Sequence, residues 1–227
     1  MLPVTMNPQQ RRYGLYYLAL SLFLLPSALS FALPPLFPHW GAAELNFVYF
    51  FINFLAATIL FRSFLLESVK ALGDDTFRLI RAVVFGFLGY WSLNYAVSSL
   101  ILFFVPDFSN INDSSLSQTI LRNYPLMAAG TVLLVPVAEE CFHRGLVFGW
   151  LLEKSRLLAY LVSITLFAAI HVIGYMGLYE PRILMLCFVQ YLPAGFCLAW
   201  AYREAGNILA PILIHAAVNA IGIFLLR

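Results

Sequence analysis

Two adjacent acidic residues, Glu139 and Glu140, lie inside an apolar stretch, residues 124–152, that is long enough to cross a lipid bilayer. Arg144 follows Glu140 by about one helical turn. An ionised side chain at the centre of a membrane helix costs about 2.5–3.5 kcal/mol on insertion scales, so charges kept at that depth indicate a functional use. Glu140 and Arg144 share a helix face and can form a structural ion pair. Glu139 is rotated by about 100° from its neighbour and is free to act as a base toward water.

Three of the four histidines, His143, His171 and His215, lie in the same C-terminal part of the chain as the acidic pair. His171 follows Phe167 by four residues, and Asn219 follows His215 at the same spacing, so each couple lies on one helix stripe. A carboxylate, two imidazoles and an amide can together activate water, donate a proton and stabilise the oxyanion of a tetrahedral intermediate. These are the requirements of amide hydrolysis.

Each of these residues also has a purely structural interpretation. An intramembrane histidine often forms an interhelical hydrogen bond worth about 1 kcal/mol, and a Glu–Arg pair can simply join two helices. His143 lies four residues after Glu139, which is compatible with a pair between them and equally with contacts to another helix or to lipid headgroups. The gathering of two carboxylates and several imidazoles on neighbouring segments favours a shared site.

The composition excludes an ordinary soluble globule, because 62% of the residues are apolar and 11% are charged, against about 25% charged in soluble domains. We therefore expect an integral membrane protein: an all-α, polytopic helical bundle in which residues 1–227 form a single transmembrane domain and residues 124–227 carry the chemistry. At about 20 apolar residues per crossing, the sequence predicts about seven spans, at residues 13–37, 45–66, 82–105, 124–152, 157–174, 183–202 and 208–226.

The first predicted span has an alternative interpretation as a signal peptide, because Arg11 and Arg12 precede an apolar run that contains small residues at positions 27–30. The run is longer than the 7–15 residues typical of a signal peptide's apolar core, and further membrane segments follow it. A membrane span is therefore the favoured interpretation.

The basic residues predict how the chain threads through the membrane, since cytoplasmic loops collect Lys and Arg. One side holds Arg11, Arg12, Arg62, Lys70, Arg78, Arg81, Lys154, Arg156 and Arg203, and the other holds Arg122, Arg182 and Arg227. This distribution places the N-terminus in the cytoplasm and the C-terminus outside.

Two features of the predicted spans affect the site. Pro136 removes a backbone donor three residues before Glu139 and predicts a kink there. Counted from the cytoplasmic ends of their spans at 1.5 Å per residue, His215 lies about 10 Å deep and His171 about 20 Å deep. Tilted or kinked helices are needed to bring the two imidazoles level.

These residues, in this order, resemble three motifs of the CAAX-protease and bacteriocin-processing family (CPBP, also called Abi). Residues 139–144, EECFHR, resemble its EExxxR motif; residues 167–171, FAAIH, its FxxxH motif; and residues 215–219, HAAVN, its HxxxN motif. The resemblance covers about residues 135–223. It implies an intramembrane endopeptidase of the bacterial cell membrane.

The resemblance also implies a role for each matched residue. Glu139 would activate water with help from His171, and His215 with Asn219 would form the oxyanion hole. Glu140 and Arg144 would then be supporting residues.

The family has been described both as metal-dependent and as glutamate-dependent without a metal, and the favoured expectation here is that no cofactor is needed. If zinc is present, Glu139, His171 and His215 are the candidate ligands, with water in the fourth position. The sequence contains no HExxH motif.

The expected partners are a membrane-associated peptide or protein substrate and the lipid bilayer, with no nucleic acid. A different class of function, a non-proteolytic membrane protein, is the alternative: a small proton-coupled transporter, or an immunity or scaffold protein. Intramembrane acids and histidines also form proton paths.

Overall fold

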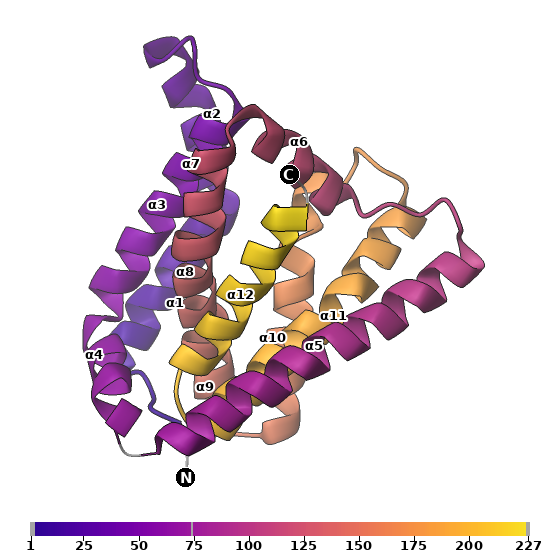
Figure 1. Ribbon diagram of the computed structural model, residues 1–227. Coiled ribbons are helices and arrows are strands. Elements are labelled where there is room, and N and C mark those ends of the chain that lie inside the picture. Colours follow the sequence, from indigo (N-terminus) through magenta and orange to yellow (C-terminus); the bar gives the residue numbers. More distant parts are fainter. Residues whose placement is uncertain (1–2, 74, 226–227) are drawn as a thin grey trace.

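The computed structural model describes residues 3–73 and 75–225, and its regular structure over these residues is helical apart from one isolated bridge between Met176 and Tyr179. The elements, shown in Figure 1, are α1 (Pro8–Phe23), α2 (Leu25–Leu36), α3 (Ala42–Leu60), α4 (Arg62–Lys70), η1 (Ala71–Gly73), α5 (Thr76–Phe104), α6 (Ile111–Arg122), α7 (Tyr124–Ala129), η2 (Gly130–Leu134), α8 (Val135–Glu140), η3 (Cys141–Phe148), α9 (Gly149–Leu152), α10 (Arg156–Ile170), η4 (Ile173–Tyr175), α11 (Pro181–Ala205) and α12 (Leu209–Leu225). The predicted all-α bundle is confirmed for the described residues.

The number of spans is lower than the seven predicted. Four helical segments are long and apolar enough to cross a membrane, and a fifth span results if α1 and α2, which are bent by 54°, form one broken crossing. Helices α10 and α12 have 15 and 17 residues. At 1.5 Å per residue they reach about 22 and 26 Å, short of a hydrocarbon core of about 30 Å. Residues 226 and 227, which the last predicted span and the charge distribution included, lie outside the described residues.

Short polar residues and glycine set where several helices begin and end. The side chains of Asn110, Asn123 and Ser155 accept hydrogen bonds from backbone N–H groups in the first turns of α6, α7 and α10. Helix α11 ends at Gly206, whose φ of 68° is the left-handed conformation that favours glycine at a helix C-terminus. The chain therefore turns directly from α11 into α12.

The long fourth segment, Tyr124–Leu152, is one helical path with two π-helical stretches, η2 and η3. Pro136 falls at the start of α8, directly after η2. A wider π turn gives room for a proline ring that would otherwise meet the carbonyl of the preceding turn. The backbone disturbance predicted at Pro136 thus takes the form of π turns on the approach to the acidic pair.

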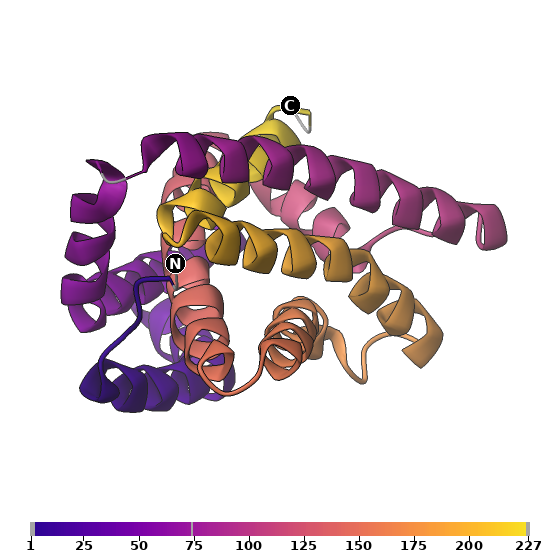
Figure 2. The same cartoon turned by 90° about the horizontal axis from the view of Figure 1, so that it is seen from below.

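This segment is the central element of the bundle. Helices α1 and α3 pack against it on one side, and α10 and α12 also contact it, with α11 and α5 beyond them. Figure 2 shows α5 and α11 running side by side, away from α1 and α3. In an 18-residue apolar window of each span candidate, 50% is buried inside the protein for this segment, against 6% for α5. A charged side chain on the central segment can therefore be enclosed by protein instead of lipid.

The described chain begins at one end of the bundle, and α12 ends at the other (Figure 1). Ion pairs at the first end join the loops that the charge distribution had placed together: Arg11 with Glu153, and Arg81 with Glu204 at 2.8 Å. The hydrogen bond from Arg11 lowers the pKa of the largely exposed Glu153 carboxyl.

Helices α10 and α11 approach closely at Gly195, where an added Cβ would lie 3.1 Å from the Ile164 Cα. We expect Gly195→Ala to lower the free energy of unfolding, because overpacking costs about 1–3 kcal/mol while the gain in helix propensity is at most about 1 kcal/mol. Thermal unfolding of the purified protein in detergent measures the change. Gly89→Ala in α5 is the matched control, since its Cβ would meet only Cys197 Sγ at an ordinary 3.6 Å. Equal melting temperatures for the two variants would contradict the tight contact.

Candidate active site

The ring of Phe167, in the last turn of α10, lies near four of the residues considered for the site. The imidazoles of His143, His171 and His215 have their centroids 5.5, 4.7 and 6.1 Å from it, and the Arg144 guanidinium carbon lies 4.3 Å from it. Side chains from η3, α12 and the end of α10 therefore surround one aromatic ring. His171 and His215, which differed in expected depth, therefore lie near the same ring.

Glu140 is the carboxylate that holds the interior of the site together. Its Oε1 accepts hydrogen bonds from Arg144 Nη1 at 3.2 Å and from His215 Nδ1 at 2.7 Å, and its Oε2 lies 3.2 Å from Arg144 Nε. The side chains of Glu140 and Arg144 are both 0% exposed. Arg144 also donates from Nη2 to the Gly195 carbonyl at 3.2 Å, which ties η3 to α11. The predicted Glu140–Arg144 pair thus includes His215 as a third member.

Glu139 is not part of the Glu140–Arg144–His215 cluster. It lines a cavity of about 60 Å³ together with His143, and both side chains present a buried polar atom with no protein partner: Oε2 of Glu139 and Nδ1 of His143. The direct Glu139–His143 pair left open by the sequence is not formed, and each of the two atoms is enclosed without a hydrogen-bond partner. The remaining lining residues are Leu18, Ser21, Leu22, Tyr49, Phe50, Asn53, Val135, Ala138, Phe142 and Ile170.

His171 lies at the C-terminal end of α10, and its Nδ1 is 2.7 Å from the Phe167 carbonyl oxygen. A carbonyl can only accept, so Nδ1 carries the proton and Nε2 is the free nitrogen. His171 is also within electrostatic range of the Glu139 carboxylate. One face of its ring stacks on Tyr191, with centroids 4.1 Å apart.

Asn219 lies one turn beyond His215 on α12, and its Nδ2 donates to the Thr131 carbonyl at 2.9 Å. That bond uses one of the two hydrogens of the amide nitrogen and leaves the other free. Thr131 belongs to η2, so the π-helical stretch before Glu139 contacts the helix that carries His215 and Asn219.

Sequence reasoning missed the contribution of α3. Tyr49 and Asn53 lie one turn apart on that helix and line the cavity at Glu139; the Asn53 side chain donates to the Tyr49 carbonyl at 2.8 Å, and the Tyr49 hydroxyl to the Ser21 carbonyl at 3.3 Å. A signal was present, because Asn53 is a buried polar residue in the middle of an apolar helix. A polar side chain at such a position usually has a partner or a function.

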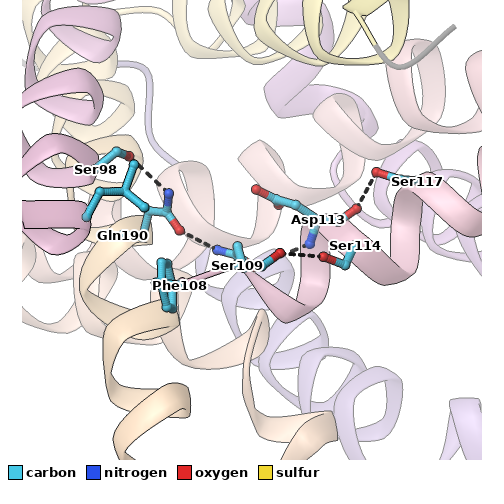
Figure 3. Close-up of a pocket in the computed structure, with 9 residues that line it drawn as sticks. Ser98, Phe108, Ser109, Asp113, Ser114, Ser117 and Gln190 are labelled. Atoms are coloured by element: carbon cyan, nitrogen blue, oxygen red, sulfur yellow. Dashed lines mark hydrogen bonds between the residues drawn. The ribbon is translucent and has the colours of Figure 1, made fainter. Parts of the chain in front are cut away.

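A second, larger pocket of about 260 Å³ lies between the end of α5, the start of α6 and α11, and Figure 3 shows its polar wall. None of the motif residues lines it. Hydrogen bonds from Asn110 Nδ2 to Gln190 Oε1 and from Gln190 Nε2 to Ser98 Oγ cross this wall at 2.8 and 3.0 Å. Of the residues considered for the site, Glu139 and His143 line the smaller cavity, and His171, His215 and Asn219 do not.

The residues suggested as zinc ligands do not fit a metal site. Over residues 3–73 and 75–225, no group of three or more His, Cys, Asp or Glu side chains is arranged to hold a metal ion. The Nδ1 atoms of His171 and His215 are engaged by Phe167 and Glu140, which leaves Nε2 as the remaining nitrogen of each ring.

The fold and the site define a polytopic helical membrane protein with a buried, charged centre that joins its C-terminal helices. Residues 121–221 match the model of a protein family described as Type II CAAX prenyl endopeptidase Rce1-like. The chain belongs to the CAAX-protease and bacteriocin-processing family, as the three motifs predicted.

Two curated bacterial proteins are similar to the chain. "UPF0177 protein YxdF" of Lactococcus lactis subsp. lactis (strain IL1403) is 30% identical over 131 residues, which cover 57% of this chain and 67% of that protein. "Putative membrane peptidase YdiL" of Bacillus subtilis (strain 168) is 29% identical over 101 residues, which cover 44% of this chain and 37% of that protein. No solved structure matches the chain.

The buried ion pair generates a stability prediction. Replacing Arg144 with Leu leaves the Glu140 carboxylate in the interior with His215 alone, and we expect the free energy of unfolding to fall by about 3–5 kcal/mol. Thermal unfolding in detergent provides the measurement, and the Glu140→Leu/Arg144→Leu double variant should recover part of the loss. Arg81→Leu, which breaks the exposed pair with Glu204, should cost less than about 1 kcal/mol. An Arg144 variant as stable as the Arg81 variant would show that Glu140 does not depend on this partner.

Proposed function

We propose that the protein is an intramembrane endopeptidase that hydrolyses a peptide bond of a membrane-associated peptide or protein, with Glu139 as the base. The observation that carries the proposal is that Glu139 and His143, each with a buried polar atom that has no hydrogen-bond partner, line one small cavity next to the Glu140–Arg144–His215 cluster. Membership of a family whose model is named for a prenyl endopeptidase supports it.

The cavity has the size and polarity to hold a reacting water. Its volume is about 60 Å³, whereas one water needs roughly 10–15 Å³. Polar side chains on its wall supply hydrogen-bond partners. Glu139 can accept a proton from that water, and His143 Nδ1 can accept or donate according to its tautomer. His171, with its free Nε2, is the second group that can take up or return a proton in the same neighbourhood.

The donors proposed for the oxyanion lie on α12. His215 is held by Glu140 through Nδ1, which leaves Nε2 as its free nitrogen; the ring donates from Nε2 when both nitrogens carry a proton. Asn219 contributes its second amide hydrogen. Because Glu140 and Thr131 fix these two side chains, their donors are oriented before the substrate binds, which is the condition for electrostatic stabilisation of a developing charge.

The proposed reaction balances without another reactant. Glu139 takes a proton from water as the water oxygen bonds to the scissile carbonyl carbon, and the carbonyl oxygen becomes an oxyanion facing His215 and Asn219. The carbon–nitrogen bond then breaks, and a proton returned by Glu139 or His171 reaches the leaving amine. The proposal uses no metal ion in any step.

The arrangement in the membrane is also part of the proposal. We place the N-terminus in the cytoplasm and the C-terminus outside, in a bacterial cell membrane, because the basic ends of α1, α4, α5, α10 and α11 gather at one end of the bundle (Figure 1). The chain acts as one transmembrane domain in which the central segment contacts helices from both halves.

Glu139→Gln should fold normally and reduce cleavage by about 10²–10⁴-fold, since it removes the base while preserving the side-chain shape. The first measurement is mass spectrometry of new peptide termini in membranes of cells that produce the wild-type protein or the variant. The substrate found in this way is then cleaved by purified protein in nanodiscs, with and without a chelator, which should have no effect.

Glu153→Gln is the control, because Glu153 is a largely exposed carboxylate paired with Arg11 and away from the cavity. Termini that persist in membranes with Glu139→Gln, or the absence of any terminus that depends on the wild-type protein, would refute the proposed function and favour a transporter or scaffold.

A further inference from the structure

Tyr191 of α11 lies flat against the His171 imidazole. The two rings are 4.1 Å apart with an interplanar angle of 23°, the closest ring contact that His171 makes. The hydrogen bond to the Phe167 carbonyl holds one edge of the imidazole, and Tyr191 covers one face. Rotation about the terminal torsion of histidine is otherwise broad, so both contacts together determine where Nε2 points.

Residues of α6, a helix outside the predicted spans, hold Tyr191 in place. Its hydroxyl donates to Asp113 Oδ1 at 2.8 Å and accepts from Asn112 Nδ2 at 2.9 Å. The hydroxyl therefore has both a donor and an acceptor partner, which fixes the ring at its far end. Asp113 also lies on the wall of the large polar pocket (Figure 3).

The start of α6 is anchored independently of Tyr191. Asn110 bonds to Gln190 of α11, and the Tyr175 hydroxyl donates to Asn112 Oδ1 at 3.4 Å. Contacts therefore run without a break from α6 through Tyr191 to His171.

We propose that Tyr191 is a positioning residue for His171: its ring sets the plane of the imidazole, and its hydroxyl, held by Asp113 and Asn112, sets the position of the ring. The inference rests on the proposed function of His171. It assigns a role to α6, which carries none of the motifs, as the support of one catalytic side chain.

The first test needs no substrate. The protein carries four histidines, so with ¹³C-labelled histidine in nanodiscs the His171 ring signal can be assigned by its loss in His171→Gln. We expect one narrow signal in the wild-type protein, and a broadened or multiple signal in Tyr191→Leu, which loses ring and hydroxyl. Tyr191→Phe keeps the ring and loses only the hydroxyl, and it should give an intermediate line width.

Tyr202→Phe is the matched control, because it removes a tyrosine hydroxyl of the same helix that bonds to the Val4 carbonyl and not to α6. Its His171 signal should equal that of the wild type. Line width and the number of signals are the readouts, since loss of a stacked ring shifts the signal in any case.

The second test uses the substrate found by the terminus analysis. Positioning predicts that kcat falls about 100-fold in Tyr191→Leu and about 10-fold in Tyr191→Phe while KM stays within about twofold. Unchanged kcat and line width in Tyr191→Leu, with His171→Gln inactive, would overturn the positioning role and leave the proposed function intact. Full activity in His171→Gln would instead overturn the role proposed for His171, and this inference with it.

Discussion

The Glu140 carboxylate, enclosed by protein and shared between Arg144 and His215, is the interaction on which the rest of the site depends. An isolated carboxylate in the interior is costly, and a guanidinium is as costly, so each requires the other and the hydrogen bonds around them. Arg144 passes the constraint on to α11 through the Gly195 carbonyl and to α10 through the Phe167 ring. One ionic cluster therefore joins three helices beside Glu139.

The central segment lowers the free-energy cost of placing this cluster in a membrane. Half of its 18-residue apolar window is buried inside the protein, against 6% of the window in α5. The π turns on either side of the acidic pair distinguish it from a regular span, and π turns are common at functional sites because they redirect side chains. The two adjacent carboxylates consequently have different environments. Glu140 is enclosed in an ionic cluster, and Glu139 lines a small cavity.

The sequence predicted the local features well because they depend on helix spacing. The separation of Glu140 and Arg144 predicted their ion pair, and the all-α architecture followed from the apolar segments. The span count was too high, since hydropathy does not show that α10 ends at Ile170 or that α1 and α2 meet at a bend.

Contacts between distant segments could not be predicted. That His215 would meet Glu140 depends on how α12 packs against α8, and the gathering of three imidazoles around Phe167 depends on the end of α10. Tyr191 is one of 12 tyrosines, and only its packing against His171 distinguishes it. Asn53 was visible in the sequence as a polar residue within an apolar helix, although its proximity to Glu139 was not.

The most direct measurement is an experimental structure of the Glu139→Gln variant with its identified substrate peptide bound in nanodiscs. The account predicts that the scissile carbonyl carbon lies within about 3–4 Å of the side chain at position 139, or one water away, with the carbonyl oxygen facing His215 and Asn219. A peptide bound with its scissile bond remote from these side chains, for example in the polar pocket beside α6, would contradict it.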